Sequence, residues 1–379
     1  MTAVAPRVSP APTVASTAGS PRVLFACGGT GGHVYPAIAI ADAVRALRPG
    51  AAVAFAGTRD RMEWEAVPKA GYPIHAITVS GFQRGLSTEA LKRNATFPFK
   101  LATGLYESWR LVGSFDPDVV VGTGGYASGP VGLAGVLRGR TLVLQEQNAV
   151  AGATNRLLAG RADRVFVAFE AARDAFSVPT TVAGNPVRQD LRGADRAEAL
   201  DHFGFPPDAR VLLAFGGSLG AAPLNDAVAR SLDAVLAVPN AHVIWAAGKR
   251  YYDGLAGSVG DERVRLLPYL DRMDLAYAAA DLAVCRSGAI TCSELAVTGT
   301  PSVLIPSPNV TADHQTQNAR ALGRATVVLP EADLDRFEAT VTALLPDDAR
   351  LLNMQEVALA IARPHAARTI AQAVLDLAP

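Results

Sequence analysis

Short apolar runs alternate with amphipathic stretches along the chain from residue 21 onward. In the first half, the runs that predict strands are residues 23–26, 52–56, 119–121, 141–144 and 164–167. A second series covers residues 211–215, 243–246, 264–266, 282–285 and 302–305. Such runs, separated by helical patterns, indicate parallel strands joined by crossover helices. The pattern predicts two α/β halves, with the Gly-Asn-Pro turn inside residues 182–191 as the hinge between them.

Each half opens with the same local device. The first strand runs into "CGGTGGHVYPAIAIA" at 27–41, where helical periodicity covers residues 36–47, and "LLAFGGSLGAAPLNDAVA" at 212–229 repeats the order of strand, glycine loop and helix. Backbone N–H groups at such a loop and helix N-terminus favour an anionic ligand. Neither loop has the dinucleotide-binding register or the Lys-Ser/Thr of a P-loop. Each loop on its own is equally consistent with glycines that only permit tight turns.

Composition and charge narrow the class of protein. The chain has 379 residues, of which 50% are hydrophobic, and its 35 basic residues balance 35 acidic ones, so we expect a globular protein without a nucleic-acid partner. The cysteines Cys27, Cys285 and Cys292 form no metal-binding or disulfide pattern. Residues 1–20 are rich in Ala, Pro, Ser and Thr and predict a disordered extension. No apolar run is long enough to span a membrane, which places the expected activity in the cytoplasm or on a membrane surface.

Polar side chains follow several predicted strands in the first half. His33 ends the first glycine loop, where a neutral imidazole suits a general base near pH 7. Tyr126 and Ser128 stand in "GTGGYASGP" at 122–130, and Glu146 and Asn148 begin "QEQNAVAGATNR" at 145–156. Amides and carboxylates at strand ends suit sugar hydroxyls. The alternative is that His33 packs locally and that these are ordinary polar loops.

The second half carries its most specific stretch at residues 281–322. Arg286-Ser287-Gly288 turns from a predicted strand into a helix, and Glu294 lies one turn further along that helix. N–H groups from Gly288 to Thr291 suit a phosphate, and the Glu294 carboxylate suits a ribose diol. Asp313 and His314 allow a metal-binding alternative, which a missing second pair of ligands disfavours.

Together these motifs resemble one family of GT-B fold glycosyltransferases, which transfers N-acetylglucosamine from UDP-N-acetylglucosamine to lipid I and so forms lipid II in peptidoglycan synthesis. The resemblance covers the chain from about residue 22. It rests on the segments GGTGGHVYPAIAIA (28–41), GTGGYASGP (122–130), QEQNAVAGATNR (145–156), GNPVR (184–188), GGSLGA (216–221), CRSGAITCSEL (285–295) and DHQTQNA (313–319).

The resemblance implies a role for each matching residue. His33 would be the general base, and the acceptor diphosphate would contact Thr30, Gly31 and Gly32. Tyr126 and Asn148 would line the site near the acceptor and the donor sugar. The residues expected to bind UDP-N-acetylglucosamine are Arg188, Ser218, Arg286, Ala289, Ile290, Thr291, Glu294, His314 and Gln315. Two positions depart from the family pattern: Gln145 stands where His is common, and Leu219 where Gln is common.

The family reaction is an inverting single displacement in which the 4-hydroxyl of the muramoyl sugar attacks as UDP leaves. The charge on UDP would be stabilised by helix N-termini and Ser218, and no acidic pair of the metal-binding type stands on a glycine loop, so we expect catalysis without metal or cofactor. The alternatives are another GT-B enzyme, such as a UDP-N-acetylglucosamine 2-epimerase or an antibiotic or glycolipid transferase, and a non-catalytic nucleotide-sugar sensor.

Residues 81–113 interleave basic residues with large apolar ones, which suits an anionic membrane surface as well as an ordinary solvated helix pair. The lipid-linked acceptor implies peripheral attachment to the cytoplasmic face of the plasma membrane, with other wall-synthesis and division proteins as expected partners. The expected domains are an acceptor-binding, membrane-facing domain at 21–184 and a UDP-N-acetylglucosamine domain at 185–363. The C-terminal helix at 364–379 is expected to pack back on the first domain.

Overall fold

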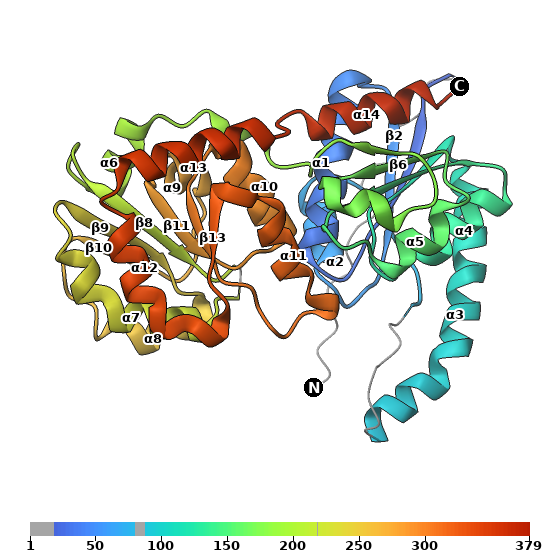
Figure 1. The fold of residues 1–379 in the computed structure, drawn as a ribbon. Helices are drawn as coiled ribbons and strands as arrows, with labels where there is room; N and C mark the ends of the chain where they lie inside the picture. Colours follow the sequence, from blue (N-terminus) through green and yellow to red (C-terminus); the bar gives the residue numbers. More distant parts are fainter. Residues whose placement is uncertain (1–18, 80–87, 218) are drawn as a thin grey trace, which may run out of the picture. The chain divides into compact units, whose positions relative to one another are not determined.

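The computed structural model describes residues 19–79, 88–217 and 219–379 (Figure 1). The side chains of residues 88–97, 189 and 311 are not described. The chain divides into a first unit, which runs to Gln147 and includes Ala151–Pro186 and His365–Pro379, and a second unit of Asn148–Val150 and Val187–Pro364. The main division after Pro186 falls two residues beyond the expected boundary at 184. The expected extension at 1–20 lies, apart from Gly19 and Ser20, outside the described residues.

The first unit is built around a parallel sheet of seven strands. Its strands are β1 (Arg22–Ala26), β2 (Ala52–Gly57), β3 (Ile74–Ala76), β4 (Val119–Gly122), β5 (Thr141–Glu146), β6 (Arg164–Val167) and β7 (Thr180–Val182). Its helices are α1 (Gly31–Leu47), α2 (Glu63–Lys69), α3 (Thr88–Phe115), α4 (Ser128–Leu137), α5 (Ala153–Ala159) and α14 (Ala366–Asp376). The strand order is β3-β2-β1-β4-β5-β6-β7, so the chain changes direction across the sheet between β1 and β4.

The apolar runs of this unit are continuous because its sheet is buried on both faces. Along β1, Val23 and Phe25 belong to one core cluster, whereas Leu24 and Ala26 belong to another. The first cluster also receives Ile370 and Val374 from α14, which packs against α1. Helix α14 therefore completes the core that lies between α1 and the sheet of the first unit.

The second unit repeats this architecture with six parallel strands in the order β10-β9-β8-β11-β12-β13. Its strands are β8 (Arg210–Phe215), β9 (Ala241–Ala246), β10 (Val264–Leu267), β11 (Leu282–Cys285), β12 (Ser302–Leu304) and β13 (Thr326–Val328). Its helices are α6 (Arg196–Phe203), α7 (Ala222–Leu236), α8 (Lys249–Ala256), α9 (Met273–Ala279), α10 (Ala289–Thr298), α11 (His314–Ala321), α12 (Phe337–Leu344) and α13 (Asp348–Ile361). Two parallel α/β units of this kind confirm the predicted fold class.

Two boundaries differ from the sequence interpretation. Helix α1 begins at Gly31 and not near Pro36, so the second pair of glycines and His33 form its first turn. Residues 88–115 form one helix, α3, with Pro98 inside it, where a pair of solvated helices was the alternative. Among the described residues, no helix combines the length and apolar character needed to cross a membrane.

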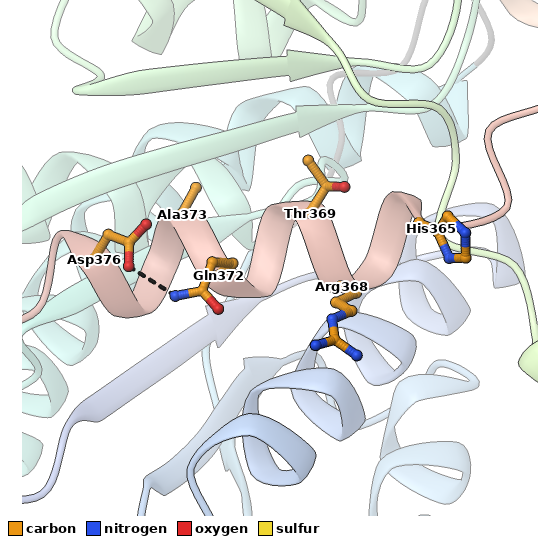
Figure 2. A pocket seen from close by; sticks show the side chains of 6 residues that line it. All are labelled: His365, Arg368, Thr369, Gln372, Ala373 and Asp376. Carbon is orange, nitrogen blue, oxygen red and sulfur yellow. Dashed lines mark hydrogen bonds between the residues drawn. The ribbon is translucent and has the colours of Figure 1, made fainter.

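Helix α14 also borders a surface hollow, lined by His365, Arg368, Thr369, Gln372, Ala373 and Asp376 (Figure 2). Its polar side chains are exposed, and Gln372 Nε2 donates to Asp376 Oδ1 at 2.8 Å. None of the residues that the sequence analysis singled out lines this hollow, so the candidate site must be sought elsewhere.

Candidate active site

Both sheets place a glycine loop where their strand order reverses. In the first unit, β1 pairs with β4, and the loops after these strands carry Gly28–Thr30 and Thr123–Ala127. In the second unit, β8 pairs with β11, and the loops after them carry Gly216–Ala221 and Arg286–Gly288. Ligands of open α/β sheets bind at this switch point, beyond the carboxyl ends of the strands. The fold therefore gathers the predicted residues at one edge of each sheet.

The two loops of the first unit are packed directly on each other. A Cβ placed on Gly125 would lie 2.2 Å from the carbonyl oxygen of Gly28, and a Cβ on Gly124 would lie 2.8 Å from Nδ1 of His33. Both glycines also have positive φ, at 92° for Gly124 and 82° for Gly125. Only glycine meets both conditions without strain. The close contact of these loops explains why the sequence is so rich in glycine here.

His33 is held from one side of its ring. Its Nδ1 lies 2.9 Å from the carbonyl oxygen of Thr123 and 2.9 Å from Oε1 of Gln147. The Thr123 hydroxyl donates to the backbone carbonyl of His33 at 2.8 Å. The half-buried imidazole is thus fixed to the loop after β4 through Nδ1. Its Nε2 forms no hydrogen bond with any of the described residues.

The first turn of α1 has the features of an anion-binding helix end. Thr30 is its N-cap residue and is exposed, but its side chain makes no capping hydrogen bond, and the turn contains no acidic residue. Gly31 and Gly32 follow at the first two helical positions. Their N–H groups and the helix dipole favour a negatively charged group at this point.

Tyr126, in the loop after β4, and Ser128, the first residue of α4, have different surroundings. The Tyr126 side chain is 59% exposed. The Ser128 hydroxyl is buried and lies 2.8 Å from the carbonyl oxygen of Gly124, and it also reaches the carbonyl oxygen of Ala26 at 2.5 Å. Ser128 therefore links the end of β1 to the loop after β4, whereas the Tyr126 side chain is open to solvent.

Helix α10 carries the candidate nucleotide site in the second unit. Its N-cap is Gly288, no side chain caps it, and Ala289, Ile290 and Thr291 form its first turn without an acidic residue. One turn later, Glu294 Oε2 accepts a hydrogen bond from the Tyr277 hydroxyl at 3.0 Å. Burial raises the pKa of Glu294 to about 7, which the Tyr277 hydrogen bond and the Arg188 charge oppose. The arrangement offers N–H groups to a phosphate and a carboxyl group to hydroxyls.

The Arg286 side chain is largely buried and held by neighbouring groups, whereas the Arg188 side chain is half exposed. Arg286 forms an ion pair with Glu331, and its Nη1 lies 3.2 Å from the carbonyl oxygens of both Ile305 and Pro306. It therefore braces the loop after β12 against the loop after β11. The Arg188 side chain is half exposed, and its Nε lies 3.9 Å from Oδ1 of Asp190. This loose contact leaves the guanidinium available to an anionic ligand.

The start of α11 brings a further polar group to this unit. Ala312 and Asp313 both have left-handed backbone angles, with φ of 55° and 49°, and this bend places His314 and Gln315 in the first turn. Gln315 Oε1 accepts a hydrogen bond from the Ser307 N–H at 2.8 Å. That contact fixes the orientation of the Gln315 amide.

Asn318 stands in the motif DHQTQNA (313–319), but the sequence analysis gives it no role of its own. Its buried amide accepts from the Ala149 N–H at 2.8 Å and donates to Asn148 Oδ1 and to the Ser287 carbonyl, each at 3.3 Å. It thereby assembles Asn148, the loop after β11 and α11 into one cluster. Spacing along the chain gives no sign of this, because Asn148 and Asn318 are 170 residues apart.

The glycine loop of the second unit is only partly described. Ser218 lies outside the described residues, so its predicted contact with a phosphate stays a prediction. Its neighbour Leu219 is 81% exposed. Gly217 and Gly220 on either side have positive φ, and α7 begins two residues after Gly220, so the loop leads directly into a helix N-terminus.

The three cysteines and Asp313 have surroundings that fit a structural role. The thiols of Cys27, Cys285 and Cys292 are buried and free, and burial raises the pKa of each. Asp313 Oδ1 accepts from the Thr316 hydroxyl at 2.6 Å. Within the described ranges, no three His, Cys, Asp or Glu side chains come together as a metal-binding group.

Comparison with known proteins agrees with this geometry. Residues 23–167 match the glycosyltransferase family 28 N-terminal domain, and residues 211–372 match the glycosyltransferase family 28 C-terminal domain. The crystal structure of MurG from Acinetobacter baumannii superposes with a TM-score of 0.77 at 29% identity, covering 94% of this chain and 99% of that one. A putative UDP-N-acetylglucosamine 2-epimerase from Listeria monocytogenes shares the fold at 15% identity, with a TM-score of 0.68 over 93% of this chain and 95% of its own. The chain is thus a GT-B fold glycosyltransferase of family 28.

A curated relative specifies the family further. The UDP-N-acetylglucosamine–N-acetylmuramyl-(pentapeptide) pyrophosphoryl-undecaprenol N-acetylglucosamine transferase of Salinibacter ruber is 56% identical over 364 residues, which are 95% of this chain and 97% of the relative. At this identity and coverage, the chain belongs to the family of these N-acetylglucosamine transferases. The resemblance drawn from the seven sequence motifs is confirmed.

Proposed function

We propose that this protein transfers N-acetylglucosamine from UDP-N-acetylglucosamine to the 4-hydroxyl of the N-acetylmuramoyl sugar of lipid I, giving lipid II and UDP. The single observation that carries this proposal is the identity of 56% over 95% of the chain to a transferase named for that reaction. The geometry of both switch points supports it, because one offers a histidine beside an anion-binding helix end and the other a nucleotide-type helix end with a carboxyl group.

In the proposed reaction, the acceptor 4-hydroxyl attacks the anomeric carbon of N-acetylglucosamine. His33 takes the hydroxyl proton on Nε2 as the new C–O bond forms, and the bond from the anomeric carbon to the UDP oxygen breaks with inversion. Thr30, Gly31 and Gly32 hold the diphosphate of the acceptor at the start of α1, and Tyr126 contributes its exposed hydroxyl near the acceptor.

The donor is assigned to the residues of the second unit. Glu294 holds the ribose diol, and the N–H groups of Ala289, Ile290 and Thr291 with the Ser218 hydroxyl stabilise the negative charge that develops on the leaving UDP. Arg188 is assigned to the diphosphate of the donor and Arg286 to the region of its uracil base. His314, Gln315 and Asn148 contact the sugar hydroxyls.

We propose that no metal ion or other cofactor takes part. The N-terminus of α10, the Ser218 hydroxyl and the Arg188 guanidinium supply the groups that neutralise a diphosphate leaving group in place of a divalent ion. Transfer therefore persists in EDTA, and added Mg²⁺ or Mn²⁺ raises kcat by less than about twofold. A strict requirement for a divalent ion would contradict this part of the proposal.

The decisive experiment measures the transfer of labelled N-acetylglucosamine to a lipid I analogue. His33→Ala lowers kcat by about 10²- to 10⁴-fold, the usual contribution of a general base. Glu294→Ala acts mainly on the KM of the donor. A protein that binds UDP-N-acetylglucosamine without turnover would instead be a sensor, and conversion to another sugar nucleotide would indicate an epimerase.

We further propose that α3 attaches the protein peripherally to the cytoplasmic face of the plasma membrane. On its described part, Phe99 is 78% exposed, Tyr106 and Trp109 are also exposed, and the Arg138 guanidinium lies 4.0 Å from the centre of the Trp109 ring. Exposed aromatic rings among cationic side chains suit an anionic lipid surface. Residues 81–87, with Arg84 and Leu86, lie outside the described residues.

This attachment is tested with vesicles that contain anionic lipid. Replacing Phe99 and Trp109 by Ser weakens binding at least about tenfold, because each large side chain loses about 1.5–3 kcal/mol of apolar burial. Leu352→Ser is the control, since Leu352 is exposed on α13 in the other unit. Equal loss in the control, or no binding to anionic vesicles at low salt, would contradict the attachment. The expected wall-synthesis and division partners stay a prediction.

A further inference from the structure

A chain of buried amide side chains lies behind the His33 imidazole. Gln147, Gln145 and Asn185 are each at most 1% exposed. Gln147 Oε1 lies 2.9 Å from His33 Nδ1, Gln147 Nε2 donates to Gln145 Oε1, and Gln145 Nε2 donates to Asn185 Oδ1 at 3.1 Å. The ring closes because Asn185 Nδ2 donates to the Gln147 backbone carbonyl at 3.0 Å. None of these three amides has a role in the reaction proposed above.

The orientation of the Gln147 amide follows from its surroundings. Its nitrogen lies 2.6 Å from the carbonyl oxygen of Thr123 and 3.2 Å from that of Gln145. Backbone carbonyls can only accept hydrogen bonds, so an amide oxygen at this place would face two further oxygens. The nitrogen of Gln147 must therefore point to these carbonyls and its oxygen to His33.

The tautomer of His33 follows from that orientation. Two acceptors, the Thr123 carbonyl and Gln147 Oε1, face Nδ1. A lone pair on Nδ1 would be repelled by both, so a neutral imidazole carries its hydrogen there. The lone pair then lies on Nε2, which is the nitrogen assigned to the acceptor hydroxyl. We propose that Gln147 is a positioning residue that sets the tautomer of His33, and that Gln145 and Asn185 lock Gln147 in place.

This inference rests on the proposed function of His33 and explains one departure from the family pattern. Residue 145 must accept a hydrogen bond from Gln147 Nε2 and donate one to Asn185 Oδ1. A glutamine amide does both, and so does a neutral imidazole with its two nitrogens. Gln145 therefore replaces the more common histidine without loss of the chain of hydrogen bonds, whereas an apolar residue would break it.

The test combines kinetics with ¹⁵N NMR of histidine-labelled protein, which distinguishes the two neutral tautomers. The chain has six histidines, and the His33 signals are those lost in His33→Gln. Gln147→Met shifts His33 away from the pure Nδ1–H tautomer and lowers kcat by about 10- to 100-fold, a part of the contribution of about 10²- to 10⁴-fold expected of a general base, with the donor KM changed less than twofold. Gln145→Leu does the same more weakly, and Gln145→His restores the wild-type tautomer and activity.

Asn225→Leu is the control, because Asn225 is also a buried amide, paired with Trp245 Nε1 at 3.0 Å in the second unit. It loses stability and leaves the His33 signals unchanged. An unchanged tautomer in Gln147→Met would overturn the proposal, as would a fall in kcat without a change of tautomer. Should Gln147→Met not fold, the pair Gln145→Leu and Gln145→His decides by the same readouts. NMR is recorded without substrate, so failure of the tautomer claim is separate from failure of the transfer reaction.

Discussion

Gly124 is the residue on which the place of the His33 ring depends most directly. A Cβ at this position would lie 2.8 Å from Nδ1 and 2.9 Å from Cε1 of the imidazole. Gly124→Ala therefore displaces the ring and lowers kcat at least about tenfold, as expected for a misplaced general base. Transfer kinetics at saturating donor measure this.

Backbone strain alone would give a different result. Gly71 also has positive φ, at 80°, but a Cβ there would meet no atom within 4 Å. Gly71→Ala should lose about 1–2 kcal/mol of stability and retain wild-type kcat. A similar fall in kcat for both variants would show that His33 does not depend on contact with Gly124.

Glu294 predicts a pH dependence in the ligand-free protein. Burial raises the pKa of this carboxyl from 4.5 to about 7, so the folded state binds its proton more tightly than the unfolded state. The free energy of unfolding is therefore unaffected below about pH 4.5 and falls as the pH rises to about 7, by at most about 3 kcal/mol. Urea unfolding across this range should show the fall in wild type and not in Glu294→Gln.

If Glu294 holds the ribose diol as proposed, the donor favours the opposite protonation state of this residue. An ionised carboxylate accepts two hydrogen bonds from a diol, so we expect the KM for UDP-N-acetylglucosamine to fall about tenfold between pH 6 and pH 8. Glu294→Gln should show a raised KM that does not vary with pH. The same pH dependence in that variant would assign the titration to another group.

At the scale of single elements, the first residue of α2 supports the glycine loop of the first unit. Glu63 is fully buried, and its carboxylate accepts from the Gly29 N–H at 3.1 Å, the Thr58 N–H at 3.0 Å and the Thr58 hydroxyl at 2.6 Å. Glu63→Ala leaves these donors unpaired and should cost about 2–4 kcal/mol of stability. Glu65→Ala on the same helix, where the side chain is exposed, should cost little. Equal urea midpoints for the two variants would contradict this role.

The strands that the sequence predicts and the strands that it misses differ mainly in their position within the sheet. The predicted strands are continuous apolar runs, because most of them have a neighbour on each side and are covered by helices. The missed strands β3, β7 and β13 have three residues each and lie at sheet edges. An edge strand pairs on one side only and stays partly exposed, so a short edge strand gives a weaker apolar signal, although the edge strand β10 was predicted from residues 264–266.

The residues of the candidate site were likewise predicted only in part. Motifs indicated His33, Glu294 and the helix N-termini, since these residues lie in glycine loops or in the first turns of the helices that follow them. Gln147, Asn185 and Asn318 stand in the same motifs but were given no role, because their function depends on contacts between distant segments, such as His33 and Gln147, which are 114 residues apart. Helix α1 was predicted to begin too late because glycines are poor helix formers, whereas the loops packed against its first turn overcome that preference.

At the scale of the whole molecule, the two units have separate cores, and the chain crosses between them more than once. Helix α14 follows the second unit in sequence and yet buries Ile370, Ala371 and Val374 in the core of the first. A truncation just before His365 would therefore remove part of the core on which α1 packs, and it would leave the second unit complete. The last residues of the chain act on the half of the enzyme that carries the proposed base.

This arrangement predicts that the units respond differently to core substitutions. Ile370→Ala should cost about 2–5 kcal/mol, the usual range for a buried Ile, and weaken hydrogen-exchange protection in β1 and α1. Met354→Ala, in the core of the second unit, should weaken protection in β8 and β9. UDP-N-acetylglucosamine, which we assign to the second unit, should restore protection in Met354→Ala and have little effect on Ile370→Ala, because a ligand stabilises the part that binds it. Equal loss of protection throughout the chain in both variants would instead show that the two units unfold as one cooperative body.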